Sequence, residues 1–146
     1  MRISTILALF FLLAACPTPG QARDAAAVGQ AYQFKFVNQG GDDVDGIAML
    51  EQKMKRRLSA AGLLDAGAAG VIDVTLQHYY MRSGGARAWT GIMSGRDKIV
   101  SQVRVLGADG AELSSFTVKS TNITAFGSAE RLMDKHVDEL LSHFDK

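Results

Sequence analysis

Apolar and polar residues along the chain alternate with two different periods, which predicts a succession of strands and helices. Aromatic residues occupy every second position from 32 to 36, a period typical of a strand with one buried face: Tyr32, Phe34 and Phe36, separated by Gln33 and Lys35. Further on, apolar residues recur at steps of three or four, as on one side of an amphipathic helix: Ile47, Leu50, Met54, Leu58, Ala61 and Leu64. Asp43 or Asp45 can cap the start of this helix, and we expect its last turn to fray from Gly62 onward.

Three more strands and a second helix are predicted beyond this point. Residues 71–81 are rich in branched and aromatic side chains and indicate a strand whose more apolar side carries Ile72, Val74, Leu76, His78 and Tyr80. Residues 99–106 and 113–120 indicate two strands joined at Asp109-Gly110, because this pair tolerates the positive φ angles of a tight hairpin turn. The apolar stripe of a closing helix consists of Leu132, Met133, Val137, Leu140, Leu141 and Phe144.

The predicted order of elements is therefore β-α-β-β-β-α. Each helix has one apolar stripe, which must be buried against another layer of structure. We expect an α+β fold in which two helices pack on one face of a small mixed or antiparallel sheet. Residues 32–146 are expected to form this fold as a single domain, because a chain of this size can bury most of the surface that it exposes when unfolded.

A family resemblance accompanies this pattern. Arg82, the pair Gly91 and Gly95, the strand 99–106, the Asp109-Gly110 turn and the polar run to Gly127 resemble a family of exported bacterial proteins. The domain of that family is of unknown function. The resemblance extends over approximately residues 45–145, rests on turn glycines and alternation, and implies no reaction.

The start of the chain predicts export. Arg2 is followed by an apolar run, residues 3–13, that is too short to cross a bilayer, because a transmembrane helix needs about 20 apolar residues. We therefore expect residues 1–15 to be a signal peptide. The tetrad Leu13-Ala14-Ala15-Cys16 resembles the lipobox of bacterial lipoproteins, which implies a diacylglyceryl group on the Cys16 thiol and an acyl chain such as palmitate on its new amino terminus. An alternative is a signal peptide cleaved after Ala22, which would release a soluble periplasmic protein.

The lipobox implies a protein that is anchored in the bacterial cell envelope and faces the periplasm, and the outer membrane is favoured over the inner one. Two or three acyl chains on Cys16 hold a protein stably in a membrane, whereas one holds it only marginally. Residues 16–31 are then the lipidated cysteine and a linker, for which flexible-coil statistics give a reach of about 20 Å. Because Cys16 is the sole cysteine, the folded part has no disulfide and no thiol nucleophile or thiolate metal ligand.

Charge and motifs argue against several functions. The net charge is +1, which gives no reason to expect nucleic acid as a partner. His136, Glu139 and His143 share one side of the closing helix, but the two histidines are two turns apart, so a solvated polar face is favoured over a metal site. No nucleophile elbow accompanies the serines, and His78 is expected to be a core or sheet-edge residue. We expect no enzyme activity, cofactor or metal.

The segment from Arg82 to Lys98 is the candidate interaction surface. It combines the only tryptophan, Trp89, with Arg82, Arg87 and Arg96 on a glycine-rich connection, and Trp and Arg are favoured anchors of interfaces. The alternative is a further strand at residues 88–93 with Trp89 in the core. The sequence thus predicts an envelope-anchored lipoprotein that acts as a non-enzymatic interaction or assembly module. A binding module for an anionic envelope ligand, such as a peptidoglycan fragment or lipid headgroup, is the alternative function.

Overall fold

The computed structural model describes residues 30–82, 96–122 and 128–145, and the predicted signal peptide, Cys16, Arg87 and Trp89 lie outside these ranges. The described elements are β1 (Gln33–Asn38), α1 (Val44–Ala60), β2 (Val71–Tyr80), β3 (Lys98–Leu106), β4 (Glu112–Thr121) and α3 (Ala129–Leu141). Their order confirms the predicted β-α-β-β-β-α sequence and the α+β fold class.

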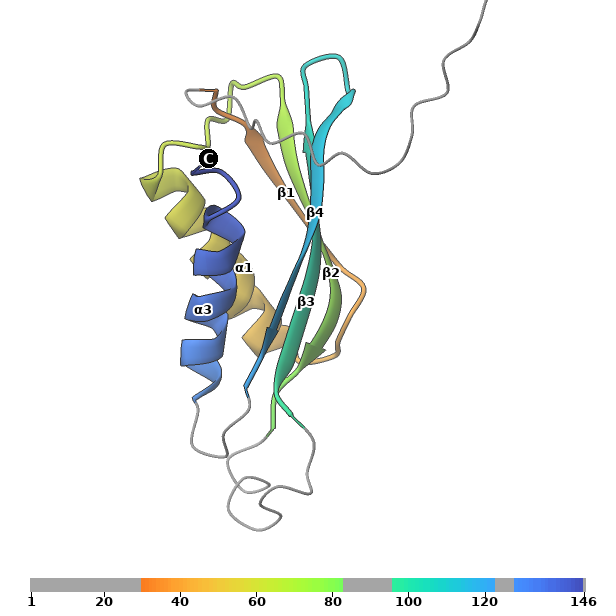
Figure 1. Cartoon of the computed structure of the whole chain (residues 1–146), viewed down its shortest axis with the longest axis vertical. Coiled ribbons are helices and arrows are strands. Elements are labelled where there is room, and N and C mark those ends of the chain that lie inside the picture. Colours follow the sequence, from red (N-terminus) through yellow and green to blue (C-terminus); the bar gives the residue numbers. More distant parts are fainter. Residues whose placement is uncertain (1–29, 83–95, 123–127, 146) are drawn as a thin grey trace, which may run out of the picture.

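The strands form one four-stranded mixed sheet in the order β1-β2-β3-β4. β1 pairs with β2 in parallel and α1 makes the crossover between them, whereas β2, β3 and β4 form an antiparallel meander. Both helices cover the same face of the sheet, and no described helix covers the other face (Figure 1). We call the end of the molecule where β1, β2 and β4 finish and both helices begin the lower end, as drawn in Figure 1, and the opposite one the upper end.

A β-bulge changes which side chains of β2 are buried. Pairing with β3 shifts between Leu76 and His78, so one extra residue reverses the alternation of inward and outward positions. Leu76 and Tyr79 are consequently buried, whereas His78 and Tyr80 are exposed on the uncovered face of the sheet. The prediction that His78 and Tyr80 share the apolar side of this strand was wrong, because simple alternation does not allow for the bulge.

The first helix is bounded by specific backbone contacts at both ends. Asp43, one of the two predicted caps, accepts a hydrogen bond on its Oδ1 from the Gly46 N–H at 3.0 Å. At the other end Gly62 has φ +73°, and the N–H groups of Gly62 and Leu63 donate to the carbonyls of Ser59 and Leu58 at 2.9 and 3.0 Å. This is a Schellman motif, which explains why the helix stops although the apolar period continues to Leu64.

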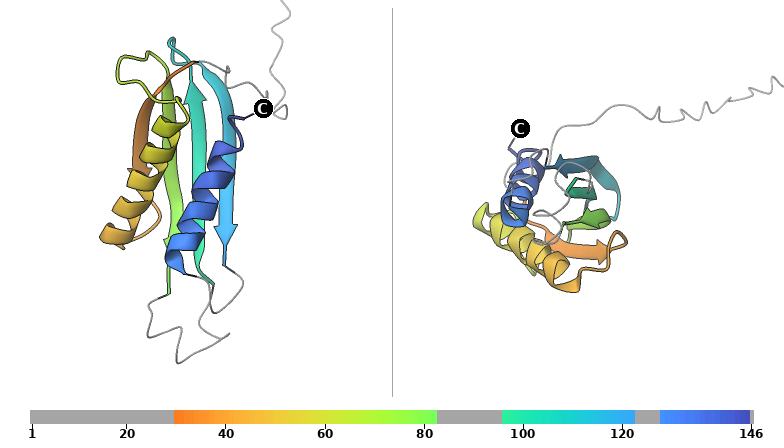
Figure 2. Two further views of the ribbon diagram at one scale, coloured as in Figure 1. Left: turned by 90° about the vertical axis from the view of Figure 1, so that its left-hand side faces the viewer. Right: turned by 90° about the horizontal axis from the view of Figure 1, so that it is seen from below.

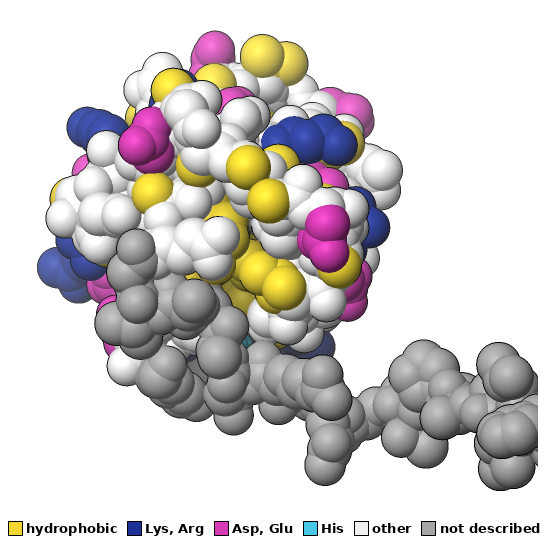
Figure 3. Space-filling view, turned by 90° about the horizontal axis from the view of Figure 1, so that it is seen from above, with side chains coloured by type: hydrophobic (Ala, Val, Ile, Leu, Met, Phe, Trp, Pro, Cys, Tyr) yellow, Lys and Arg dark blue, Asp and Glu magenta, His cyan; other side chains and the backbone are white. Residues whose placement is uncertain are grey.

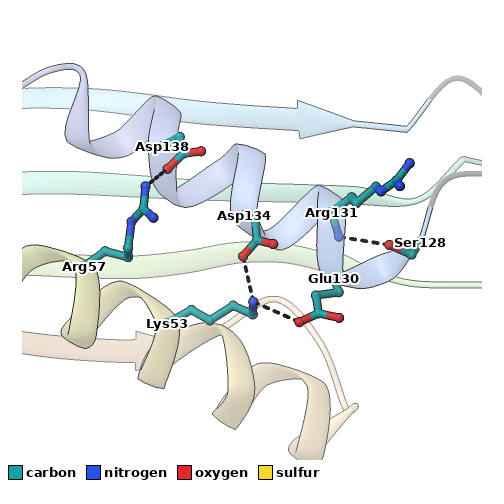
Figure 4. A network of polar contacts seen from close by, with 7 residues as sticks. All are labelled: Lys53, Arg57, Ser128, Glu130, Arg131, Asp134 and Asp138. Atoms are coloured by element: carbon teal, nitrogen blue, oxygen red, sulfur yellow. Dashed lines mark hydrogen bonds and ion pairs between the residues drawn. The ribbon is translucent and has the colours of Figure 1, made fainter.

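The core lies between the sheet and the two helices. It contains Leu50, Met54 and Leu58 of α1, Ile72, Val74 and Leu76 of β2, Ile99, Val103 and Val105 of β3, and Leu132, Met133, Val137 and Leu140 of α3. The helices run in the same direction and are joined on their outer side by ion pairs: Lys53 contacts Glu130 and Asp134 at 3.4 and 2.6 Å, and Arg57 contacts Asp138 (Figure 4). Equal four-residue steps on both helices keep these partners in register.

Candidate functional site

The described part of the predicted interaction surface begins with a buried ion pair at the lower end. Arg82 is 7% exposed and Asp97 is 0% exposed. The backbone N–H and the Nε of Arg82 both donate to Asp97 Oδ1, at 2.8 and 3.1 Å, and the Asp97 carbonyl accepts from the Asn122 N–H at 3.0 Å. The pair therefore ties together the ends of β2, β3 and β4. Of the predicted surface residues, Arg96 is exposed, whereas the Arg82 guanidinium is engaged inside the protein.

Tyr79 lies next to this pair. Burial raises the pKa of its phenol to about 12, with further contributions from the charges of Asp43 and Asp97. The phenol therefore stays protonated at neutral pH and cannot serve there as a general base. Its oxygen lies so near Gly46 that a Cβ at this position would come within 2.3 Å of it, which explains the glycine in the first turn of α1.

A chain of polar side chains crosses the core between α3 and the sheet. Ser120 Oγ donates to Glu139 Oε2 at 3.0 Å, so it accepts from the N–H at His136 Nδ1, which is also at 3.0 Å. The other ring nitrogen, Nε2, is then the acceptor for the Ser101 hydroxyl at 2.9 Å. In this arrangement both ring nitrogens of His136 and both serine hydroxyls have a hydrogen-bond partner. Burial lowers the pKa of His136 to about 4, so the ring is neutral at physiological pH.

This chain contains the residue types of a hydrolase but lacks access. Ser101 and His136 are both 0% exposed, so no substrate can reach the hydroxyl without opening the core. The closed chain instead fixes α3 on β3 and β4. The sequence held a signal for it, because His136 follows Leu132 and precedes Leu140 by four residues on the apolar stripe, and Ser101 and Ser120 occupy inward positions of their strands.

The prediction of a solvated polar face for His136, Glu139 and His143 was wrong at His136, which is 0% exposed, and the three side chains do not come together. His136 is in the core, Glu139 contacts Ser120, and His143 is exposed and stacks on Phe116 with ring centroids 4.1 Å apart. In the described part of the chain, no group of three or more His, Cys, Asp or Glu side chains is arranged to hold a metal ion. The described helices also include none that is long and apolar enough to cross a membrane.

The uncovered face of the sheet carries a charge cluster that sequence reasoning missed. Lys35, Asp73 and Arg104 occupy the same row of three neighbouring strands. The Asp73 side chain is 4% exposed, and its Oδ2 contacts the Arg104 and Lys35 nitrogens at 2.8 and 3.6 Å. Only the pairing register brings these residues together, since they are far apart in sequence.

The upper end presents a shallow hollow with a mixed lining. Figure 3 shows apolar side chains near the centre of this end with charges of both signs around them. The hollow has a volume of about 620 Å³ and is lined by Lys55, Arg56, Ser59, Ala60, Leu64, Asp65 and Ala66. The lining thus combines two exposed cations, Lys55 and Arg56, with the exposed carboxylate of Asp65.

Comparison with known proteins identifies relatives of the fold alone. No protein-family model and no curated protein sequence matches the chain. Among solved structures, PelC of Paraburkholderia phytofirmans, described as a dodecamer, is 14% identical with a TM-score of 0.60 over 79% of this chain and 86% of that one. A variant of the same dodecamer is 15% identical, with a TM-score of 0.61 over 79% of this chain and 85% of that one. A hypothetical protein of Chlamydia trachomatis is 10% identical, with a TM-score of 0.52 over 79% of this chain and 98% of the other.

Proposed function

We propose that the protein is an envelope-anchored lipoprotein that acts as a non-enzymatic interaction or assembly module. The observation that carries the proposal is the fold shared with PelC, whose solved forms are dodecamers. The closed Ser101–His136–Ser120 chain supports the absence of catalysis at this site, because its serine and histidine have no exposed surface.

The position of the chain start gives the anchored protein an orientation. β1 begins at the upper end, so a tether from Cys16 joins the domain there (Figure 1). With a linker reach of about 20 Å, the upper end faces the membrane and the lower end, with Arg82 and Arg96, points into the periplasm. Partners in the periplasm would therefore meet the lower end and the sides of the sheet first.

The anchor itself is tested by changing its sulfur. Cys16→Ser is expected to abolish acylation and to move the protein from the membrane fraction to the soluble periplasmic fraction. Intact mass measurement of the detergent-extracted protein reports the acyl chains, and fractionation separates the outer from the inner membrane. A native product that starts at Arg23 without acyl mass would overturn the lipoprotein assignment and establish the soluble alternative.

The partner is tested in the same preparation by co-purification. Trp89→Ala is expected to remove a packed protein partner, whereas charge reversal at Arg87 and Arg96 is expected to have a smaller effect. The matched control is Glu112→Lys, at an exposed position at the start of β4. Co-purification that is unchanged by Trp89→Ala would exclude the predicted surface.

A second function, binding of an anionic envelope ligand, is favoured by the hollow at the upper end. Lys55 and Arg56 line it together with Leu64 and Ala66, so an anionic headgroup placed there could contact both cations and apolar side chains. Lys55→Glu combined with Arg56→Glu is expected to abolish such binding and its salt dependence. Sedimentation with vesicles that contain anionic lipid, compared with neutral vesicles, measures the difference.

A further inference from the structure

The two lateral sides of the domain differ in charge at the lower end. β1 with α1 forms one side, which we call the β1 side, and β4 with α3 forms the other, the β4 side (Figure 2). On the β1 side, the loop after β1 and the first turn of α1 carry three carboxylates: Asp42, Asp43 and Asp45. Val44 stands among them with 77% of its surface exposed. No described basic side chain forms an ion pair with any of these acids.

The β4 side carries the opposite charge. Lys119 of β4 points away from the core, since its neighbours Val118 and Ser120 are buried. Arg131 and Lys135 lie four residues apart on α3, on the flank of Glu139, which contacts Ser120 of β4. Figure 4 shows Arg131 pointing away from α1. Within the described ranges, none of these three cations has an ion-pair partner.

The two clusters stand at the same height on the molecule. The sheet register places Asn38, the last residue of β1, in one row with Leu76, Ser101 and Val118. Lys119 follows Val118 directly, and the loop with the acids follows Asn38. Both helices also begin at this end, so Asp45 and Arg131 lie in the first turns of α1 and α3. Rotation about an axis parallel to the strands therefore brings the acids of one copy against the cations of the next.

We propose that a second copy of this chain docks its β4 side onto the β1 side, in a head-to-tail contact guided by these charges. The inference rests on the proposed assembly function and names its partner and its surfaces. Because the two surfaces differ, each copy offers one of each, and the contact repeats into a ring or a filament. Exposed ion pairs contribute little individually, so the charges select the orientation of the contact. Burial of Val44 and of the half-buried Phe34 and Phe36 supplies the apolar contact.

The test uses the full lipidated protein in detergent, with native mass spectrometry and sedimentation at about 0.05 M and about 0.5 M salt. The wild type is expected to form oligomers that weaken at high salt. Arg131→Glu with Lys135→Glu, or Asp42→Lys with Asp45→Lys, is expected to weaken self-association about tenfold or more. The chain with all four changes, and an equimolar mixture of the two double variants, should assemble again, because opposite charges then meet at every contact. Asp43 is left unchanged because it caps α1.

Glu112→Lys is the control, since it reverses an exposed charge at the upper end of β4, away from both charge clusters, and should leave assembly intact. Circular dichroism confirms that each variant is folded. A wild type that stays monomeric at low salt refutes the inference. If an envelope protein still co-purifies with this monomer, the proposed interaction function stands although self-association is excluded. Equal loss of assembly in the control, or failure of the four-fold variant to recover, also refutes the charge-guided contact.

Discussion

The buried imidazole of His136 predicts that the domain loses stability in mild acid. Its pKa is about 4 in the folded protein, against 6.5 for an unperturbed histidine, because burial disfavours the charged ring. The unfolded chain therefore binds a proton at higher pH than the folded one. The contribution to stability is fully present above pH 6.5, is lost as the pH falls toward 4, and changes no further below that value. At 1.36 kcal/mol for each unit, the loss is about 3 kcal/mol.

Urea unfolding at several pH values between 7 and 4 measures this loss. The control is His136→Gln, which is less stable throughout but lacks the titrating ring and keeps His78 and His143. The difference between the two pH profiles isolates His136, because all other ionisable groups are common to both proteins. Parallel profiles for the wild type and the variant, or an NMR titration of the His136 ring with a midpoint near 6.5, would refute the reasoning.

Two further substitutions test the lower end and the helix end. Arg82→Met removes the guanidinium partner of the fully buried Asp97 and is expected to lower the free energy of unfolding by about 3 kcal/mol. Arg96→Met, at an exposed position, should change it by no more than about 0.5 kcal/mol, and urea unfolding compares the two variants. Gly62→Ala places a side chain at φ +73° and is expected to cost about 1 kcal/mol although the space around it is open. Gly62→Asn, which tolerates this conformation, should recover most of the loss in the same thermal unfolding assay, and an equal cost for both would argue against backbone strain.

The elements of the fold follow from local patterns, and their lateral contacts do not. Two-residue and three-to-four-residue periods identify the four strands and two helices that the structure describes, and Asp43 and Gly62 mark the ends of α1 as expected. The bulge at β2 has no local signal, so the orientation of His78 and Tyr80 was missed. The Lys35–Asp73–Arg104 cluster and the Ser101–His136–Ser120 chain depend on strand register and on helix placement, which periodicity does not determine.

Arg82 shows the same limit at the candidate surface. In sequence it belongs to a run of basic residues beside Trp89, which suggests a common exposed surface. In space the end of β2 brings it against Asp97 at the start of β3, and the guanidinium becomes a structural partner. The remaining predicted contacts, Arg87, Trp89 and the lipid on Cys16, stay predictions that the proposed experiments address.

In the proposed tethered protein, the parallel pairing of β1 with β2 would have a mechanical consequence. A load applied between the tether at the upper end and a partner held at the lower end pulls along β1. The hydrogen bonds that residues 33–38 make with β2 then share the load, because sliding β1 along β2 must break them all at once. Under the proposed tethering, β1 is thus joined to β2 in a shear geometry, in which its interstrand hydrogen bonds share the load.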